Sequence, residues 1–74
     1  MQQATQEALE LTVNGERRSF AAKLTVAAML AELGLDIRKV AVERNEEIVR
    51  RATYADIVLK SGDVLEIVHF IGGG

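Results

Sequence analysis

The sequence contains no cysteine and no proline, and it has only one histidine, His69. The lack of cysteine excludes a disulfide framework, a thiolate zinc site and a reactive side-chain thiol. No apolar run approaches the roughly 20 residues that a membrane-spanning helix needs. Residues 1–7 lack the basic start and the apolar stretch of a signal peptide. We therefore expect a cytoplasmic protein with no membrane partner.

The charged residues give no sign of a nucleic-acid partner or of a metal site. The formal net charge is −2 and the arginines are scattered among acidic residues, so no basic surface is predicted. Asp36, Asp56 and Asp63 stand apart, without the spacing of metal ligands. A length of 74 residues, of which 49% are apolar, instead fits one small domain with a thin core.

The sequence opens with a predicted β-hairpin. Residues 9–13 alternate between apolar and polar side chains, which is typical of a half-buried strand. Asn14 and Gly15 suit the positive φ angles of a tight hairpin turn. Residues 17–21 are expected to form the returning strand, with Phe20 as its main apolar residue.

A single short helix is predicted over residues 26–33. Thr25 can cap its first turn by accepting a backbone hydrogen bond, and Gly34 can end it in a left-handed conformation. Its apolar face comprises residues at spacings of three and four: Val26, Met29, Leu30 and Leu33. Because so short a helix is marginal alone, it must pack against a sheet.

The second half of the chain predicts further strands. Residues 40–44 form one, a turn at residues 45–46 follows, and residues 48–49 form a short strand before an irregular segment at 52–56. A turn at residues 60–63 combines Gly62, which can take a positive φ, with Asp63, which can bond its own backbone. Residues 64–71 form a final strand that is apolar on both faces, as expected for a central strand.

These elements predict an α+β domain with a mixed sheet of four to five strands and one main helix packed on one face. The order of the elements resembles the β-grasp fold of ubiquitin. We expect residues 1–7 to be a flexible lead, residues 8–71 to form the β-grasp domain and residues 72–74 to form a flexible tail.

The tail is the feature that carries chemistry. Gly72, Gly73 and Gly74 follow the last apolar strand directly. Since glycine lacks a Cβ, such a tail can enter a cleft too narrow for side chains. With Ile71 it can extend about 13–14 Å, far enough to bring the Gly74 carboxylate to ATP inside a partner's pocket. The alternative, a glycine tail without a role, stays open because chain ends are commonly disordered.

Residues 62–74, Gly-Asp-Val-Leu-Glu-Ile-Val-His-Phe-Ile-Gly-Gly-Gly, resemble the C-terminal signature of the ThiS family, the sulfur carriers of thiamin biosynthesis. Residues 13–16, the helix at 26–33 and residues 40–45 also resemble the family pattern, each more weakly. The resemblance therefore covers nearly the whole chain, and its most specific part is the glycine-containing end. The polar lead at residues 1–7 is a departure, since many members begin at the first strand.

The resemblance implies a protein co-substrate rather than an enzyme. A ubiquitin-activating-type (ThiF-like) adenylyltransferase would use ATP and Mg²⁺ to adenylate the Gly74 carboxylate, with Gly72 and Gly73 as the part that enters its pocket. A persulfide, supplied by a cysteine desulfurase, would convert it to a thiocarboxylate. Thiazole synthase (ThiG-like) would then take the sulfur. No cofactor bound by the chain itself is implied.

The last strand also suggests where partners bind. If Leu65 and Ile67 face the helix, Val68 and Phe70 lie on the opposite face. We predict that Val68, Phe70 and Ile71 bind the partners through an apolar surface. The alternative is that Phe70 packs on a neighbouring strand or loop.

Other residues are assigned lesser roles. His69 has no second ligand or base nearby in the sequence, so a structural or interface role is preferred to a catalytic one. Arg50 and Arg51 either meet an acidic surface of the adenylating enzyme or simply face solvent.

Three other functions remain open at this stage. The small subunit of molybdopterin synthase shares the fold and the glycine chemistry, although its proline-containing ending differs from His69-Phe70-Ile71 here. A ubiquitin-like protein modifier would be joined through Gly74 to a lysine. A plain binding module would have no use for the tail.

Overall fold

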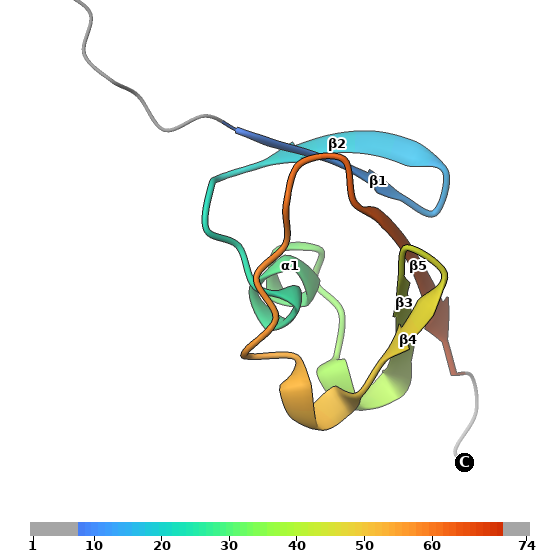
Figure 1. The fold of residues 1–74 in the computed structure, drawn as a ribbon. Helices are drawn as coiled ribbons and strands as arrows, with labels where there is room; N and C mark the ends of the chain where they lie inside the picture. The colour runs from blue at the N-terminus through green and yellow to red at the C-terminus, as the bar shows by residue number, and fades with distance from the viewer. Residues whose placement is uncertain (1–7, 71–74) are drawn as a thin grey trace, which may run out of the picture.

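A computed structural model describes residues 8–70 (Figure 1). Eight elements follow in chain order: β1 (Leu9–Val13), β2 (Glu16–Phe20), α1 (Val26–Glu32), the 3-10 turn η1 (Ile37–Lys39), β3 (Val40–Arg44), β4 (Glu47–Val49), the 3-10 turn η2 (Arg51–Thr53) and β5 (Val64–His69). The predicted lead at residues 1–7, the residue Ile71 and the glycines at 72–74 lie outside the described residues.

The strands form one mixed five-stranded sheet in the order β2-β1-β5-β3-β4. Only β1 and β5 are parallel, and the other neighbouring pairs are antiparallel. The sheet curves around α1, which packs on one face (Figure 1). The predicted α+β architecture, with one helix on one face of a mixed sheet, is confirmed.

Both hairpins turn through two residues with positive φ. Asn14 and Gly15 have φ angles of 50° and 85°, and Asn45 and Glu46 have φ angles of 53° and 72°. Two successive left-handed residues match the twist of the flanking strands, as in type I′ turns. Asparagine tolerates this conformation better than most side chains, so the predicted turns are confirmed.

Helix α1 begins and ends as its sequence indicates. The Thr25 side chain accepts a hydrogen bond from the Ala28 N–H at 3.0 Å. At the other end Gly34 has a φ of 75°, and the Leu35 N–H donates to the Leu30 carbonyl at 2.9 Å, which is the pattern of a Schellman motif. The helix ends at Glu32, one residue earlier than predicted, because Leu33 already serves as its C-cap.

The core lies between α1 and the curved face of the sheet. Its fully buried side chains come from every layer: Leu11, Val26, Met29, Leu30, Val40, Val42, Tyr54 and Leu65. Tyr54 belongs to the segment predicted as irregular at residues 52–56, the start of which overlaps η2, and it is the C-cap of that turn. Its carbonyl accepts a hydrogen bond from the Ala27 N–H at 2.9 Å. The loop after β4 is therefore fixed to α1 through a core residue.

Strand β5 is central, as predicted, but only one of its faces is buried. Leu65 is fully buried at 0% exposure, whereas Val68 on the opposite face is 59% exposed. The single helix can cover only one face of the sheet, so the other stays open. The described strand ends at His69, although the Phe70 N–H still donates to the Lys39 carbonyl at 2.8 Å.

Asp63 is not isolated, as its sequence position suggested. Its Oδ2 accepts hydrogen bonds from the Arg44 Nε and the Lys60 N–H, both at 2.9 Å, and its Oδ1 accepts one from the Asn45 side chain at 3.0 Å. Burial raises the pKa of the Asp63 carboxyl, but the hydrogen bonds from Lys60, Asn45 and Arg44 outweigh it and hold that pKa below its usual value.

This network makes the stability of the fold depend on pH. A carboxyl whose pKa is lower in the folded state stabilises the fold above its unfolded pKa of about 3.9, and the contribution is lost as the pH falls through the folded pKa. Replacing Asp63 by Asn should lower the free energy of unfolding at pH 7 by about 1–3 kcal/mol. It should also flatten the decline in stability below pH 4.

Urea denaturation followed by circular dichroism between pH 2 and 7 measures both effects. Asp56→Asn is the matched control, because Asp56 is exposed, and it should reproduce the native pH profile. Equal stability of the Asp63 variant and the native chain at pH 7 would contradict the role given to this network.

Candidate functional site

The candidate site is the end of β5, from which the chain continues into Ile71 and the three glycines. The structure describes the platform that precedes them, and the predicted roles of Ile71, Gly72, Gly73 and Gly74 stay predictions. The geometry that bears on function is therefore how Ile67 to Phe70 are held, and what surrounds them.

On one side this end of β5 is held by the side chain of Asn14. The parallel β1–β5 ladder has only two residue pairs, Thr12 with Val64 and Val13 with Leu65. Beyond them, the Asn14 Oδ1 accepts a hydrogen bond from the Ile67 N–H at 2.7 Å, and the Asn14 Nδ2 donates to the Ile67 carbonyl at 3.2 Å. The side-chain amide thus replaces the next peptide group of the ladder, and we call this contact the Asn14 bridge.

On the other side β3 holds the strand throughout. The pairing runs from Arg44 with Leu65 to Val40 with His69, and the Phe70 N–H adds one further bond to the Lys39 carbonyl. The residues of β5 up to Phe70 are therefore fixed by main-chain hydrogen bonds.

The face of the sheet opposite α1, which we call the open face, exposes apolar side chains beside this end of β5. Val68 and Phe70 are 59% and 52% exposed, and Ile48 of β4 is 76% exposed. Leu65 is buried and Ile67 packs partly against the core, so the alternation of β5 side chains is as predicted. The role of Val68 and Phe70 in partner binding stays a prediction.

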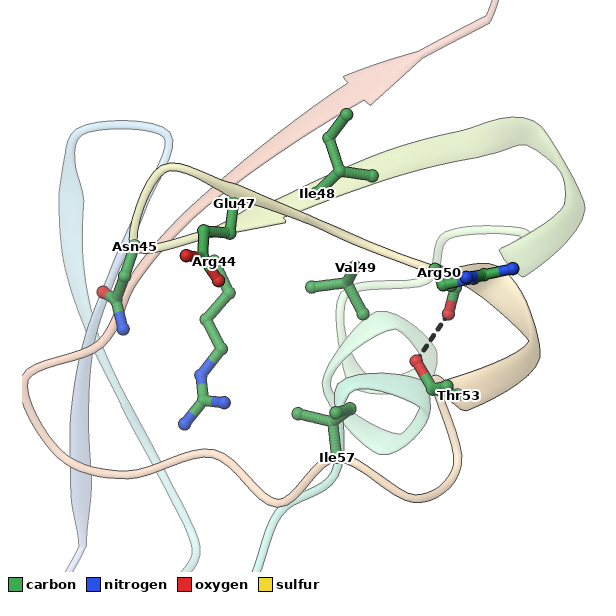
Figure 2. Close-up of a pocket in the computed structure, with 8 residues that line it drawn as sticks. All are labelled: Arg44, Asn45, Glu47, Ile48, Val49, Arg50, Thr53 and Ile57. Carbon is green, nitrogen blue, oxygen red and sulfur yellow. Dashed lines mark hydrogen bonds between the residues drawn. The ribbon is translucent and has the colours of Figure 1, made fainter.

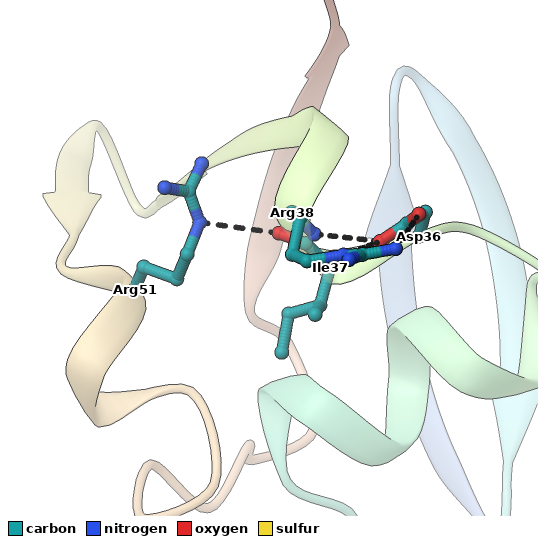
Figure 3. A network of polar contacts seen from close by, with 4 residues as sticks. All are labelled: Asp36, Ile37, Arg38 and Arg51. Carbon is teal, nitrogen blue, oxygen red and sulfur yellow. Dashed lines mark hydrogen bonds and ion pairs between the residues drawn. The ribbon is translucent and has the colours of Figure 1, made fainter.

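Arg51 has a structural contact that its place in a paired-arginine motif did not indicate. Its Nε donates to the Ile37 carbonyl and its Nη2 to the Val40 carbonyl, both at 3.2 Å. As Figure 3 shows, the side chain reaches from η2 across to η1. Arg51 is exposed, as one of the two predicted alternatives requires, and this contact also joins η2 to the start of β3; its meeting an acidic partner surface stays a prediction.

Asp36 and Arg38 form an exposed pair beside that contact (Figure 3). The Arg38 Nη2 and the Asp36 Oδ2 are 3.1 Å apart. Hydrogen bonds from the Arg38 side chain and backbone lower the pKa of the Asp36 carboxyl to about 2. The Arg38 side chain is 79% exposed and the Asp36 side chain 33% exposed, so solvent weakens this pair as a source of stability. His69 is exposed and paired with Val40 at the strand end.

A recess of about 400 Å³ lies between β4 and the segment after η2 (Figure 2). Arg44 points into it but already donates to Asp63, and Thr53 at its far end donates its hydroxyl to the Arg50 carbonyl at 2.7 Å. Within residues 8–70, no buried side-chain polar atom lacks a partner. The recess therefore offers no polar group that calls for a ligand.

Two further properties concern only the described part of the chain. Residues 8–70 contain no group of three or more acidic or histidine side chains placed to hold a metal ion. None of the helices in this range is long and apolar enough to cross a membrane.

The fold and the strand that leads into a glycine tail define a ubiquitin-like β-grasp protein. The UBL domain of yeast Ddi1 shares the fold, with a TM-score of 0.53 at 19% identity over 97% of this chain and all of that one. A crystal structure of the thiamine biosynthesis protein ThiS from Geobacter metallireducens is closer, with a TM-score of 0.77 at 35% identity, covering 89% of this chain and 100% of that one.

The sequence comparisons agree. The model of the ThiS family matches residues 11–74. The sulfur carrier protein ThiS of Bacillus subtilis is 46% identical over 50 residues, which are 68% of this chain and 76% of that protein. The chain belongs to the ThiS family.

A longer relative is also similar. A thiazole synthase of Paramagnetospirillum magneticum is 59% identical over 66 residues, covering 89% of this chain. The matched region spans only 20% of the length of that protein. In that relative a region similar to this chain is therefore part of a much larger polypeptide.

The Asn14 bridge was missed by the sequence analysis, which treated Asn14 only as a turn former. Replacing Asn14 by Gly keeps a residue suited to positive φ but removes both hydrogen bonds to Ile67. We expect the free energy of unfolding to fall by about 1 kcal/mol. We also expect the Ile67 amide to exchange faster with solvent deuterium.

Ser19→Ala serves as the control, because it removes the hydrogen bond from Ser19 to Glu10, far from this end of β5. Its Ile67 amide should exchange at the native rate. Native exchange at Ile67 in the Asn14 variant would show that the bridge does not hold the strand end.

Proposed function

We propose that this chain is a sulfur carrier that works through the carboxylate of Gly74. A ubiquitin-activating-type (ThiF-like) adenylyltransferase binds the tail, and the Gly74 carboxylate oxygen attacks the α-phosphorus of ATP, releasing pyrophosphate. Mg²⁺ and ATP belong to that enzyme, and this chain binds no cofactor of its own. It acts as a co-substrate and not as an enzyme.

Sulfur enters in the second step. The terminal sulfur of a persulfide, formed by a cysteine desulfurase, attacks the Gly74 acyl carbon and AMP leaves. Cleavage of the remaining sulfur–sulfur bond by a thiol yields the Gly74 thiocarboxylate and a disulfide. A ThiG-like thiazole synthase then takes the sulfur for the thiazole ring of thiamin. Because the cycle consumes ATP and cysteine sulfur, we place it in the cytoplasm.

The observation that carries this proposal is the way β5 is held up to Phe70. A tail that must reach a nucleotide in another protein benefits from an ordered base. When the residue before the tail is already held in place, binding does not lose the conformational entropy of that residue. The Asn14 bridge on one side and the β3 ladder on the other supply that ordered base. Membership of the ThiS family and the name of the Bacillus subtilis relative support the sulfur chemistry.

The exposed part of β5 supplies the proposed docking surface. Val68 and Phe70 lie just before the tail and are about half exposed. An apolar contact beside the entering tail would hold the domain while Gly72, Gly73 and Gly74 occupy the narrow part of the partner's pocket. Ile71, between the two parts, would enter the same contact.

The sulfur transfer is tested by intact mass. Incubation with ATP, Mg²⁺, a ThiF-like adenylyltransferase, a cysteine desulfurase and cysteine should add about 16 mass units, because one terminal oxygen is replaced by sulfur. A variant that lacks Gly74 should gain nothing. The mass of the starting protein also shows whether its chain ends at Gly74. No gain in mass with the complete set of enzymes would refute the proposal.

The docking role of Val68 is tested by truncation to alanine. Removing an exposed valine from the edge of an apolar contact should weaken binding to the adenylyltransferase by about 1 kcal/mol, or roughly fivefold in Kd. Val58→Ala is a closely matched control, because Val58 is 52% exposed and lies in the segment before β5 that bridges to Thr25. Calorimetry of both variants decides the matter, and equal losses would remove the special role of Val68.

A further inference from the structure

Two glutamates face each other in the middle of the open face. Glu43 of β3 and Glu66 of β5 are directly opposite in the antiparallel ladder, and both are exposed. Opposed side chains in such a ladder have Cβ atoms about 4.5–5.5 Å apart. Around them lie apolar side chains: Ala41 opposite Val68, Ile48 opposite Glu43, and Val64 two residues before Glu66 on the same strand.

Like charges placed opposite each other destabilise a sheet, and within residues 8–70 neither glutamate takes part in an ion pair. Arg44, the neighbour of Glu43 in the sequence, points to the other face and binds Asp63. Arg17 of β2 is separated from β5 by β1, and Arg50, which follows β4 beside β3, forms none of the ion pairs found within residues 8–70. Residues 1–7 and 71–74 contain no lysine or arginine. Among residues 8–70, no cationic side chain is within ion-pair distance of either glutamate.

We propose that the glutamate pair receives an arginine side chain of thiazole synthase when that enzyme docks on the open face. This inference rests on the proposed sulfur-carrier function and names the chemistry of one of its partners. A guanidinium group is planar and offers several donors in a fixed fork, so it can bind both carboxylates at once. The single charge of a lysine ammonium fits two separated carboxylates less well.

The surroundings of the pair strengthen such a contact. The exposed apolar side chains of Ile48, Val64 and Val68 would exclude water around the charges when a partner covers them. Electrostatic interactions grow stronger as water leaves, and a charge pattern at the centre of an apolar contact fixes the register of the two proteins. Val68 is also two residues from Phe70, the last described residue before the tail, so docking here brings the enzyme close to the base of the tail.

Thiazole synthase is the partner to which the comparisons point. The relative that is 59% identical to this chain bears that name, and the similar region makes up 20% of its length. A region like this chain and the remainder of that protein thus stand in one polypeptide. When two domains stay together in one polypeptide, a contact surface that is complementary in charge as well as in shape is favoured.

The test uses the complete chain with Glu43→Gln, Glu66→Gln and both changes together, against the thiazole synthase of the same organism. The double variant should bind at least tenfold more weakly at low salt, and its Kd should depend less on salt than the native Kd does. Its melting temperature should equal or exceed the native value, since the repulsion is gone. Glu32→Gln on α1, behind the sheet, is the matched charge control and should bind as the native chain does.

The inference would be overturned by native affinity of the double variant, by an unchanged salt dependence, or by a lower melting temperature that reveals a stabilising role within the fold. Loss of binding to the adenylyltransferase alone would also overturn it, because thiazole synthase would then be the wrong partner. The mass assay for the Gly74 thiocarboxylate is run separately. If the double variant gains the same mass as the native chain and also binds thiazole synthase with native affinity, this inference is wrong and the proposed function is unaffected.

Discussion

The structure depends on the way two asparagines hold the central strand. Asn14 and Asn45 each occupy the first position of a left-handed hairpin turn, and each turns its side chain onto β5. Asn14 bonds both main-chain groups of Ile67, while Asn45 accepts from the Val64 N–H at 2.9 Å and donates to Asp63 at 3.0 Å. Since β1 runs parallel and β3 antiparallel to β5, both hairpins end beside the same stretch of that strand. The turns that shape the hairpins are thus also the contacts that join them.

This arrangement explains why the sheet can leave one face uncovered. A single seven-residue helix cannot cover five strands on both faces, and the domain is too small to add another layer. The apolar residues of β5 that point away from α1 therefore remain exposed beside the strand end. In a sheet held only by its core, such exposure would be a liability, but here main-chain and asparagine hydrogen bonds fix β5 independently of that face.

The local elements were predictable from the sequence because their causes are local. The Asn14-Gly15 turn, the Thr25 cap and the Gly34 stop each depend on one or two residues whose backbone preferences are known. What could not be predicted joins residues far apart in the chain. Asp63 meets Arg44 across 19 positions, and Asn14 meets Ile67 across 53. Neither contact has a signature in composition or periodicity. The same holds for the candidate site: alternation placed Val68 and Phe70 on one face, but only the register of β3 against β5 brings Glu43 opposite Glu66.

The opposed glutamates show how stability and recognition compete in so small a domain. A pair of lysine and glutamate at these positions would favour the free fold, yet it would leave the open face with its charges already satisfied. Two carboxylates instead weaken the free domain slightly and reserve their interaction for an incoming cation. The fold tolerates this cost because Arg44 of β3 and Asp63, which directly precedes β5, form a partly buried ion pair. The face packed on α1 thus stabilises the sheet, and the open face can keep its glutamate pair without a cation until a partner binds.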